Sequence, residues 1–318
     1  MMTGKMKLLI TESENFSENA ILELKKHFEV EVANLFSEEE LVEKIKTVDV
    51  LFIRLRFKLS KEILIQTSSL KYILTATTGL DHINVDYFQE NGGTVISLKG
   101  EADFLGTIPS TAEHTWGLLL ALMKKIPNAF ADVKSGNWNR DNFKGNNLKD
   151  KKIGILGLGR VGKQVAKFAE AFQMEVRYFD VQPIESHFEK FNTPNDLFAW
   201  SDIISIHIPY TVENEKYIDK ELLNNCKSSA ILINTSRGKI WDETVVAEFL
   251  KENKIKAIAT DVLFDEYNDS VSKNPLVQLA NLNYDIIITP HIAGATFESM
   301  TMTEDFIVTK FLNTLKSN

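Results

Sequence analysis

The chain has 318 residues, of which 44% are hydrophobic and 25% are charged, so its composition is that of a folded globular protein and excludes disordered and fibrous classes. This length favours two domains. The 44 acidic residues outnumber the 36 basic ones and give a net charge of −8, which argues against a nucleic-acid or anionic-membrane partner.

The sequence contains one cysteine, Cys226, which excludes an internal disulfide and a cysteine-rich metal site. It contains no apolar run of about 20 residues, the length that would span a membrane. The first ten residues do not resemble a signal peptide, because their apolar run is too short. We therefore expect a cytoplasmic protein that binds no metal.

Short apolar runs alternate with amphipathic stretches through the amino-terminal third. The stretch after Ser17 is typical of a helix, with a capping serine and apolar residues at Ile21, Leu24 and Phe28. This alternation predicts a small α/β domain with a parallel sheet. The predicted strands are residues 8–10, 30–33, 50–54, 72–75 and 95–98.

A second apolar helix is expected at residues 110–123. Ser110 and Glu113 match a capping box, with Pro109 just ahead of the helix. Residues 116–123 are apolar almost all round, so the helix must be buried on more than one side. We interpret it as a link wedged between two domains or between two subunits.

A second array of strands follows the Gly/Asn-rich residues 139–147. Its apolar runs are continuous, as expected for parallel strands that helices cover on both faces. The sequence therefore predicts an α/β fold with a second parallel sheet. The predicted strands are residues 153–156, 176–179, 203–207, 231–234, 257–261 and 286–289.

A Gly-x-Gly-x-x-Gly motif lies between the first strand of this array and a predicted helix. Gly157 permits a tight turn, Gly159 lets a pyrophosphate approach the backbone, and Gly162 lets the helix pack closely on the strand. Asp180 ends the next strand, where a carboxylate binds the ribose hydroxyls of NAD and repels the 2′-phosphate of NADP. The motif thus predicts a dinucleotide site for NAD.

Ionisable residues end the later strands, and parallel strands place such residues at one edge of the sheet. Arg237 can bind a carboxylate through two hydrogen bonds, and His291 can supply a proton near neutral pH. Glu266 would fix the imidazole tautomer if it binds the other ring nitrogen. This set fits the reduction of a 2-oxo acid. His207 is expected to contact the cofactor or to pack at its strand end, and His27, His82, His114 and His187 are interpreted as structural or exposed.

Taken together, these motifs resemble the D-isomer-specific 2-hydroxyacid dehydrogenases over essentially the whole chain. The resemblance implies a Rossmann dinucleotide-binding domain, a smaller flavodoxin-like α/β substrate domain, and a homodimer formed through the cofactor domain. It implies Arg237, Glu266 and His291 as the catalytic residues. The implied NAD-binding residues are Gly157, Leu158, Gly159, Arg160, Val161, Gly162, Asp180, His207, Thr235, Asp261 and Gly294.

The family's architecture also implies a discontinuous substrate-binding domain, residues 1–101 and 293–318, because the last helix returns to it. Residues 102–292 would form the NAD-binding domain. The hinges would then lie near residues 102 and 293, and closure about them would exclude water from the reaction.

Within the family, residues 53–58 look most like D-3-phosphoglycerate dehydrogenases, in which an arginine at the position of Arg54 helps to bind the substrate's phosphate. Leu55 and Phe57 replace that group's small polar residues, and the sequence ends at Asn318 without the regulatory domain that many of those enzymes carry. The alternative interpretation is that Arg54 lies on a solvent-exposed edge of the domain and binds no phosphate. Residues 77–79 match the family's backbone cradle for the substrate carboxylate, which implies Thr77, Thr78 and Gly79 as binding residues.

The sequence leaves the substrate open. D-3-phosphoglycerate is one candidate, and glyoxylate, hydroxypyruvate or another 2-oxo acid are alternatives. A protein of another class, an NAD(H)-sensing regulator on the same fold, would retain the same residues. A formate dehydrogenase would not need the Arg–Glu–His set, because its reaction requires no proton donor.

Overall fold

The computed structural model describes residues 5–266 and 271–317, which form two compact units. Unit 1 contains the described residues up to Thr107 together with those from Ala295 onward, and unit 2 comprises Ile108–Gly294. Among the helices of these described ranges, none combines the length and apolar character needed to cross a membrane.

Unit 1 contains a parallel five-stranded sheet in the order β2-β1-β3-β4-β5. All five strands expected from the sequence form close to their predicted bounds. The strands are β1 (Lys7–Ile10), β2 (Glu29–Val32), β3 (Val50–Ile53), β4 (Tyr72–Thr75) and β5 (Thr94–Ile96). The helices are α1 (Glu18–His27), α2 (Glu38–Ile45), α3 (Lys61–Leu64), α4 (Val85–Glu90), α5 (Ala102–Gly106) and α13 (Phe297–Ser317).

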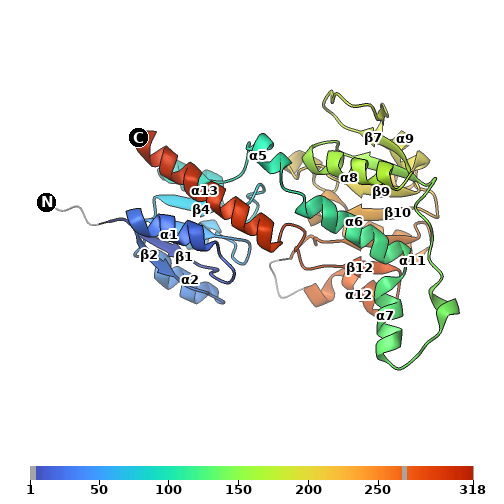
Figure 1. Ribbon diagram of the computed structural model, residues 1–318, viewed down its shortest axis with the longest axis horizontal. Coiled ribbons are helices and arrows are strands. Elements are labelled where there is room, and N and C mark those ends of the chain that lie inside the picture. The colour runs from blue at the N-terminus through green and yellow to red at the C-terminus, as the bar shows by residue number, and fades with distance from the viewer. Residues whose placement is uncertain (1–4, 267–270, 318) are drawn as a thin grey trace. The chain divides into compact units, whose positions relative to one another are not determined.

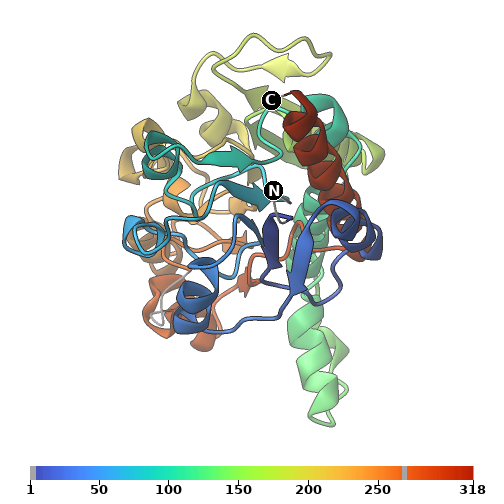
Figure 2. The ribbon, with the colours of Figure 1, turned by 90° about the vertical axis from the view of Figure 1, so that its left-hand side faces the viewer.

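Helices cover both faces of this sheet, which explains why its central strands are apolar throughout. Successive strand residues point to opposite faces, so Leu8 and Phe52 contribute to one core while Leu9 and Leu51 contribute to the other. Helices α1 and α13, from opposite ends of the chain, lie side by side on the first face (Figures 1 and 2). As predicted, Ser17 caps α1, with its Oγ accepting a hydrogen bond from the Ala20 backbone N–H.

Unit 2 contains a parallel seven-stranded sheet in the order β12-β11-β10-β9-β6-β7-β8. Its strands are β6 (Lys152–Leu156), β7 (Glu175–Phe179), β8 (Glu189–Lys190), β9 (Ile203–Ile206), β10 (Ile231–Asn234), β11 (Ala257–Thr260) and β12 (Ile286–Ile288). The helices are α6 (Ser110–Met123), α7 (Ile126–Lys134), α8 (Arg160–Ala171), α9 (Pro194–Trp200), α10 (Lys220–Leu223), α11 (Glu243–Lys251) and α12 (Pro275–Asn281). The described residues of unit 2 also form the short 3₁₀ helices η1 (Arg140–Phe143), η2 (Val212–Asn214), η3 (Gly238–Ile240) and η4 (Val271–Lys273).

The strand order reverses beside β6. The chain runs from β6 outward to β7 and β8, then returns to β9 on the other side of β6 and continues outward to β12. In a parallel α/β sheet, such a reversal opens a crevice at the carboxyl ends of the two central strands, where ligands bind. The six longer strands were predicted from the sequence, whereas the two-residue strand β8 was not.

Helix α6 departs from the sequence prediction at its amino end. Its cap is Pro109, and Ser110 lies inside the helix with an Oγ that has no hydrogen-bond partner in the described structure, so the predicted capping box is wrong. The apolar faces pack within unit 2, where Trp116 contacts Phe168 and Phe172 while Leu119 joins the core under the sheet. The interpretation of α6 as a link between two domains or two subunits is not tested by this packing and stays a prediction.

Phe311 on α13 provides a test of how the carboxyl-terminal helix stabilises unit 1. Its ring is fully buried and stacks on Phe28 with a centroid distance of 5.4 Å. We expect Phe311→Ala to destabilise unit 1 by about 3–5 kcal/mol, because it leaves a large cavity. The control Phe297→Ala removes an exposed ring from the same helix and should leave the thermal unfolding midpoint nearly unchanged. Equal midpoints for the two variants would contradict this role of α13.

Candidate active site

The candidate residues of unit 2 lie at one edge of its sheet, because they follow the carboxyl ends of parallel strands. Each longer strand contributes at least one of them. The contributing residues are Gly157 after β6, Asp180 after β7, His207 after β9, Thr235 and Arg237 after β10, Asp261 and Glu266 after β11, and His291 and Gly294 after β12.

The glycine loop has the backbone geometry that a dinucleotide site requires. Gly157 has a φ of +93°, and a Cβ there would lie 2.9 Å from the His207 carbonyl carbon. A Cβ on Gly162 would lie 2.2 Å from the Gly157 carbonyl oxygen, so only glycine lets α8 pack this closely on the loop. By contrast, a Cβ on Gly159 would meet nothing in the described chain within 4 Å.

That open space at Gly159 lies at the amino end of α8, where backbone N–H groups are not used within the helix. Leu158 is buried in the core, while Arg160 and Val161 are partly buried in the first turn. Burial lowers the pKa of the Arg160 guanidinium, and its Nη1 donates to the Ile108 carbonyl at 3.4 Å. The loop therefore fits the pyrophosphate of a dinucleotide.

Asp180 lies beside this loop and helps to shape it. Its Oδ2 accepts a hydrogen bond from the Leu158 backbone N–H at 2.8 Å, and its Oδ1 accepts one from Gln182 N–H at 2.9 Å. A carboxylate oxygen can accept more than one hydrogen bond, so both oxygens retain capacity for ribose hydroxyls. The chain's own residues thus fit the adenosine end of NAD.

Two further predicted cofactor residues make internal contacts at the same edge. His207 Nε2 lies 2.8 Å from Ser205 Oγ, and burial lowers the pKa of His207 to about 3. The lowered pKa favours the neutral imidazole. Thr235 is buried, with its Oγ1 2.7 Å from Thr115 Oγ1 on α6.

Asp261 organises the segment that follows β12. This carboxylate is 1% exposed, and it accepts hydrogen bonds from Thr289 Oγ1 at 2.6 Å, Ile292 N–H at 2.9 Å and Ala293 N–H at 2.7 Å. Burial by itself would raise the pKa of Asp261, but these bonds and a contact from His114 outweigh it and lower the pKa. Asp261 is therefore an ionised carboxylate that fixes residues 289–293.

Within residues 289–293, the side chain of His291 contacts Glu266. His291 has a φ of +53°, a left-handed conformation, and its N–H donates to the Asp261 carbonyl at 2.8 Å. Its Nδ1 lies 2.6 Å from Glu266 Oε1, and the two side chains are 23% and 22% exposed. The structure thus brings together the histidine and glutamate that the sequence pairs. This contact orients the imidazole ring through its Nδ1.

The backbone next to Arg237 packs closely against the loop that carries Glu266. A Cβ on the next residue, Gly238, would lie 2.0 Å from the Leu263 carbonyl carbon, so glycine allows the Arg237 turn to touch the loop that leads to Glu266. Arg237 Nη1 donates to the Ser236 carbonyl at 2.7 Å. Among the described residues, no hydrogen bond joins Arg237 to His291.

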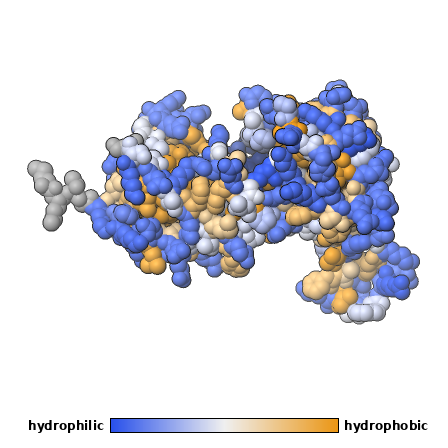
Figure 3. All heavy atoms as spheres, turned by 45° about the horizontal axis from the view of Figure 1, so that its top comes forward, coloured by the Kyte–Doolittle hydropathy of each residue, from blue (hydrophilic) through white to orange (hydrophobic). Residues whose placement is uncertain are grey.

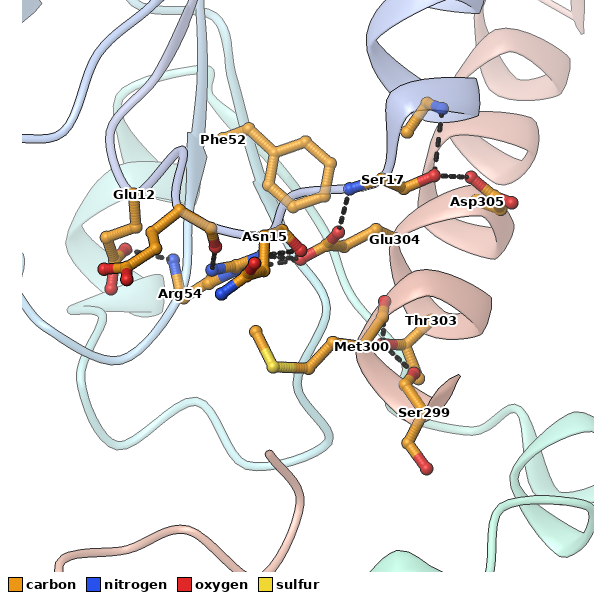
Figure 4. A network of polar contacts seen from close by, with 12 residues as sticks. Glu12, Asn15, Ser17, Phe52, Arg54, Ser299, Met300, Thr303, Glu304 and Asp305 are labelled. Carbon is orange, nitrogen blue, oxygen red and sulfur yellow. Dashed lines mark hydrogen bonds and ion pairs between the residues drawn. The ribbon is translucent and has the colours of Figure 1, made fainter. Parts of the chain in front are cut away.

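Unit 1 carries the predicted substrate residues at the carboxyl edge of its own sheet. Thr77 Oγ1 donates to the Gly79 carbonyl at 2.8 Å and so folds the turn that contains Thr78, which is exposed. Arg54 follows the neighbouring strand β3, and its guanidinium contacts Glu304 of α13 (Figure 4). This side chain is therefore engaged within unit 1.

Two positioning residues were missed by the sequence analysis. His114 Nε2 lies 2.9 Å from Thr289 Oγ1 and 3.4 Å from Asp261 Oδ1, so it belongs to the group that fixes the His291 segment. Glu243 is buried and accepts a hydrogen bond from Phe264 N–H at 2.8 Å, in the loop before Glu266. In the sequence His114 stands between two other polar residues, Glu113 and Thr115, so no local signal pointed to it, and none pointed to Glu243. Among the described residues, no cluster of His, Cys, Asp and Glu could hold a metal ion.

Three features together define a dinucleotide-binding domain. They are a parallel sheet whose strand order reverses beside β6, a glycine loop at the start of α8, and an acidic residue after β7. Residues 116–293 match the family model described as D-isomer specific 2-hydroxyacid dehydrogenase, NAD binding domain. The chain therefore belongs to the D-isomer specific 2-hydroxyacid dehydrogenase family, and the matched segment, within unit 2, is its NAD-binding domain.

Proteins similar to this chain are named for different substrates. It is 38% identical to D-3-phosphoglycerate dehydrogenase of Methanocaldococcus jannaschii over 92% of this chain and 54% of that protein. It is 33% identical to hydroxypyruvate reductase of Thermotoga maritima over 82% of this chain and 83% of that one. The structure of Aquifex aeolicus D-lactate dehydrogenase, complexed with NAD and lactic acid, matches with a TM-score of 0.81 and 26% identity over 98% of this chain and 96% of that one.

The chain spans about half the length of the phosphoglycerate dehydrogenases among these relatives, as the 54%, 57% and 47% shares of three of them indicate. Its fold and its NAD-binding domain follow from family membership, whereas the substrate does not.

Replacement of Asp180 tests the cofactor assignment. We expect Asp180→Ala to weaken NADH binding about tenfold or more and to narrow the preference for NADH over NADPH, because the carboxylate that accepts from ribose is lost. The measurement is fluorescence titration with both cofactors. Glu175→Ala, at the opposite end of the same strand, is the matched control and should leave both affinities unchanged. An unaltered preference in Asp180→Ala would overturn the assignment.

Proposed function

We propose that the protein is an NAD-dependent D-2-hydroxyacid dehydrogenase that interconverts a small 2-oxo acid and the corresponding D-2-hydroxy acid. The observation that carries the proposal is the 2.6 Å contact between His291 Nδ1 and Glu266 Oε1, made at the carboxyl edge of a sheet whose glycine loop fits a dinucleotide. A histidine oriented by a carboxylate is a suitable general acid and base.

Each residue of the proposed site has its own role in the reaction. NADH supplies a hydride for the second carbon of the substrate. His291 donates a proton from Nε2 to the oxygen on that carbon, and in the reverse direction it removes the proton. Glu266 accepts the Nδ1 hydrogen bond and so holds the tautomer that this transfer requires. Arg237 binds the substrate carboxylate through its planar guanidinium.

Unit 1 is proposed as the substrate-binding domain, with the backbone of Thr77, Thr78 and Gly79 binding the carboxylate. The hydrogen bond from Thr77 Oγ1 to the Gly79 carbonyl supports this assignment, because it fixes the turn independently of a ligand. Candidate substrates are 3-phosphohydroxypyruvate, hydroxypyruvate and glyoxylate, which correspond to the substrates named for the relatives.

The direct test is NADH oxidation with a panel of 2-oxo acids that includes these three, pyruvate, and branched and aromatic analogues. We expect turnover with at least one of them and a preference for NADH over NADPH. If NADH binds but no panel member is reduced, the enzymatic proposal fails, and a regulator that senses NAD(H) becomes the better account.

His291→Ala should lower kcat by roughly 10²–10⁴-fold, the usual contribution of general acid–base catalysis, while NADH affinity persists. The control is His187→Ala, because the His187 side chain is 70% exposed and contacts Glu170. That variant should keep wild-type kcat. A near-normal rate in His291→Ala would reject His291 as the proton donor.

A homodimer is proposed on the basis of helix α7, which projects from the body of unit 2 (Figure 2). Ile126, Phe130 and Val133 occur at helical spacing and are 53%, 65% and 48% exposed, and nearby Trp138 is 88% exposed. This part of the surface is hydrophobic (Figure 3), as is typical of a subunit interface. A cytoplasmic location is also proposed, since Cys226 is the only cysteine.

Light scattering should give a dimer mass for the wild type and a monomer mass for Phe130→Glu, because a buried unpaired charge opposes association. Phe36→Glu changes an exposed ring in unit 1 and should remain dimeric. A wild-type monomer, or a dimer that Phe130→Glu leaves intact, would contradict the proposed interface.

A further inference from the structure

Arg54 has little capacity left for a ligand. Its Nε and Nη2 both donate to Glu304 Oε1, the former at 2.8 Å, while Nη1 donates to the Glu14 carbonyl at 2.8 Å and Nη2 to the Asn15 carbonyl at 3.3 Å (Figure 4). Four of the five guanidinium N–H groups are thus engaged. The side chain is 16% exposed, and its guanidinium carbon lies 5.3 Å from the centre of the Phe16 ring.

Glu304 is fixed as the partner of Arg54. Its side chain is 1% exposed, and its second oxygen, Oε2, accepts a hydrogen bond from Ser17 N–H at 2.8 Å. Both carboxylate oxygens therefore accept hydrogen bonds, as an ionised carboxylate does. Burial raises the pKa of Glu304, and the positive charge of Arg54 acts against this. Moving Arg54 away would leave a buried carboxylate without its counter-charge, which is costly.

Glu12 fixes the Arg54 segment from the other side. This residue is 5% exposed, and its carboxylate accepts hydrogen bonds from the Arg54 N–H at 2.6 Å and the Arg56 N–H at 2.8 Å. The Arg56 guanidinium in turn donates to Asn34 Oδ1 and the Leu35 carbonyl, both at 2.7 Å. The two carboxylates, Glu12 and Glu304, balance the charges of the two guanidinium groups, so this cluster has no excess positive charge to attract a further anion.

We propose that Glu304 is a specificity-determining residue: it occupies Arg54 and so disfavours substrates with a phosphate at the end away from the carboxylate. The substrate class would then be 2-oxo acids whose distal group is uncharged. This proposal rests on the proposed function, because it concerns the substrate of the same reaction. Under this proposal Arg54 has a structural role: it joins the segment that follows β3 to helix α13. This role replaces the phosphate-binding role that the sequence suggested.

The test measures competitive inhibition by D-glycerate and D-3-phosphoglycerate, two probes that differ only in the phosphate, against the best 2-oxo acid of the panel. In the wild type, D-3-phosphoglycerate should bind no more tightly than D-glycerate. In Glu304→Ala, which frees the guanidinium, the inhibition constant of D-3-phosphoglycerate should fall by about tenfold or more, since a charged hydrogen bond to phosphate becomes available. The D-glycerate constant should stay within about threefold.

Several variants keep this test specific. Glu304→Gln removes the charge at nearly the same size and should shift the inhibitor ratio in the same direction, so the test does not depend on the folding of Glu304→Ala. Asp305→Ala is the matched control, because Asp305 contacts Ser17 rather than Arg54, and it should leave the ratio unchanged. In the double variant Arg54→Ala/Glu304→Ala the gain should disappear.

Two results would overturn the proposal. One is wild-type protein that binds D-3-phosphoglycerate at least about tenfold more tightly than D-glycerate. The other is a set of Glu304 variants that change both inhibition constants equally. Failure of the proposed function has a different signature, because it would show as NADH binding without turnover of any 2-oxo acid.

Discussion

Asp261 is a buried carboxylate, and the geometry of the proposed active site depends on how its charge is satisfied. An ionised group with 1% exposure must receive hydrogen bonds from its surroundings. Here the donors are Thr289 Oγ1 and the N–H groups of Ile292 and Ala293, so the segment around His291 has little freedom to change shape. The left-handed conformation of His291 is maintained by the same contacts.

In unit 1, buried carboxylates likewise fix a loop at the carboxyl end of a strand. Glu12 and Glu304 are both buried, and each accepts hydrogen bonds from the segment that follows β3. In both units, a carboxylate that cannot reach water fixes a loop at the carboxyl end of a strand. The two loops differ in the residue they hold: in unit 2 it is His291, the proposed proton donor, and in unit 1 it is Arg54, whose charge is balanced by Glu304.

Much of this structure could be predicted from local sequence. Strands covered on both faces are continuously apolar, so β6 and β10 were recognisable from four or five residues each. The glycine motif specifies its own backbone geometry, and residues that end parallel strands must share an edge. The contact between Glu266 and His291 follows from that rule together with the chemistry.

Contacts between distant segments could not be predicted in this way. The partner of Arg54 lies 250 residues away on α13, and nothing near Arg54 in the sequence indicates which charge will meet it. His114 contacts Asp261 only because α6 packs under the sheet. The capping box at Ser110 fits the local pattern, but Pro109 occupies the cap position and Ser110 is already the first residue of the helix.

The central claim is that this chain adds a hydride and a proton across the carbonyl of a 2-oxo acid to give the D-product. The most direct measurement is product analysis after reduction with NADH that carries deuterium at both positions of its hydride-donating carbon, with a 2-oxo acid whose product is chiral, using NMR and chiral chromatography. The account predicts one deuterium on the second carbon of the product and the D configuration. An L-product, or a product without deuterium at that carbon, would contradict it.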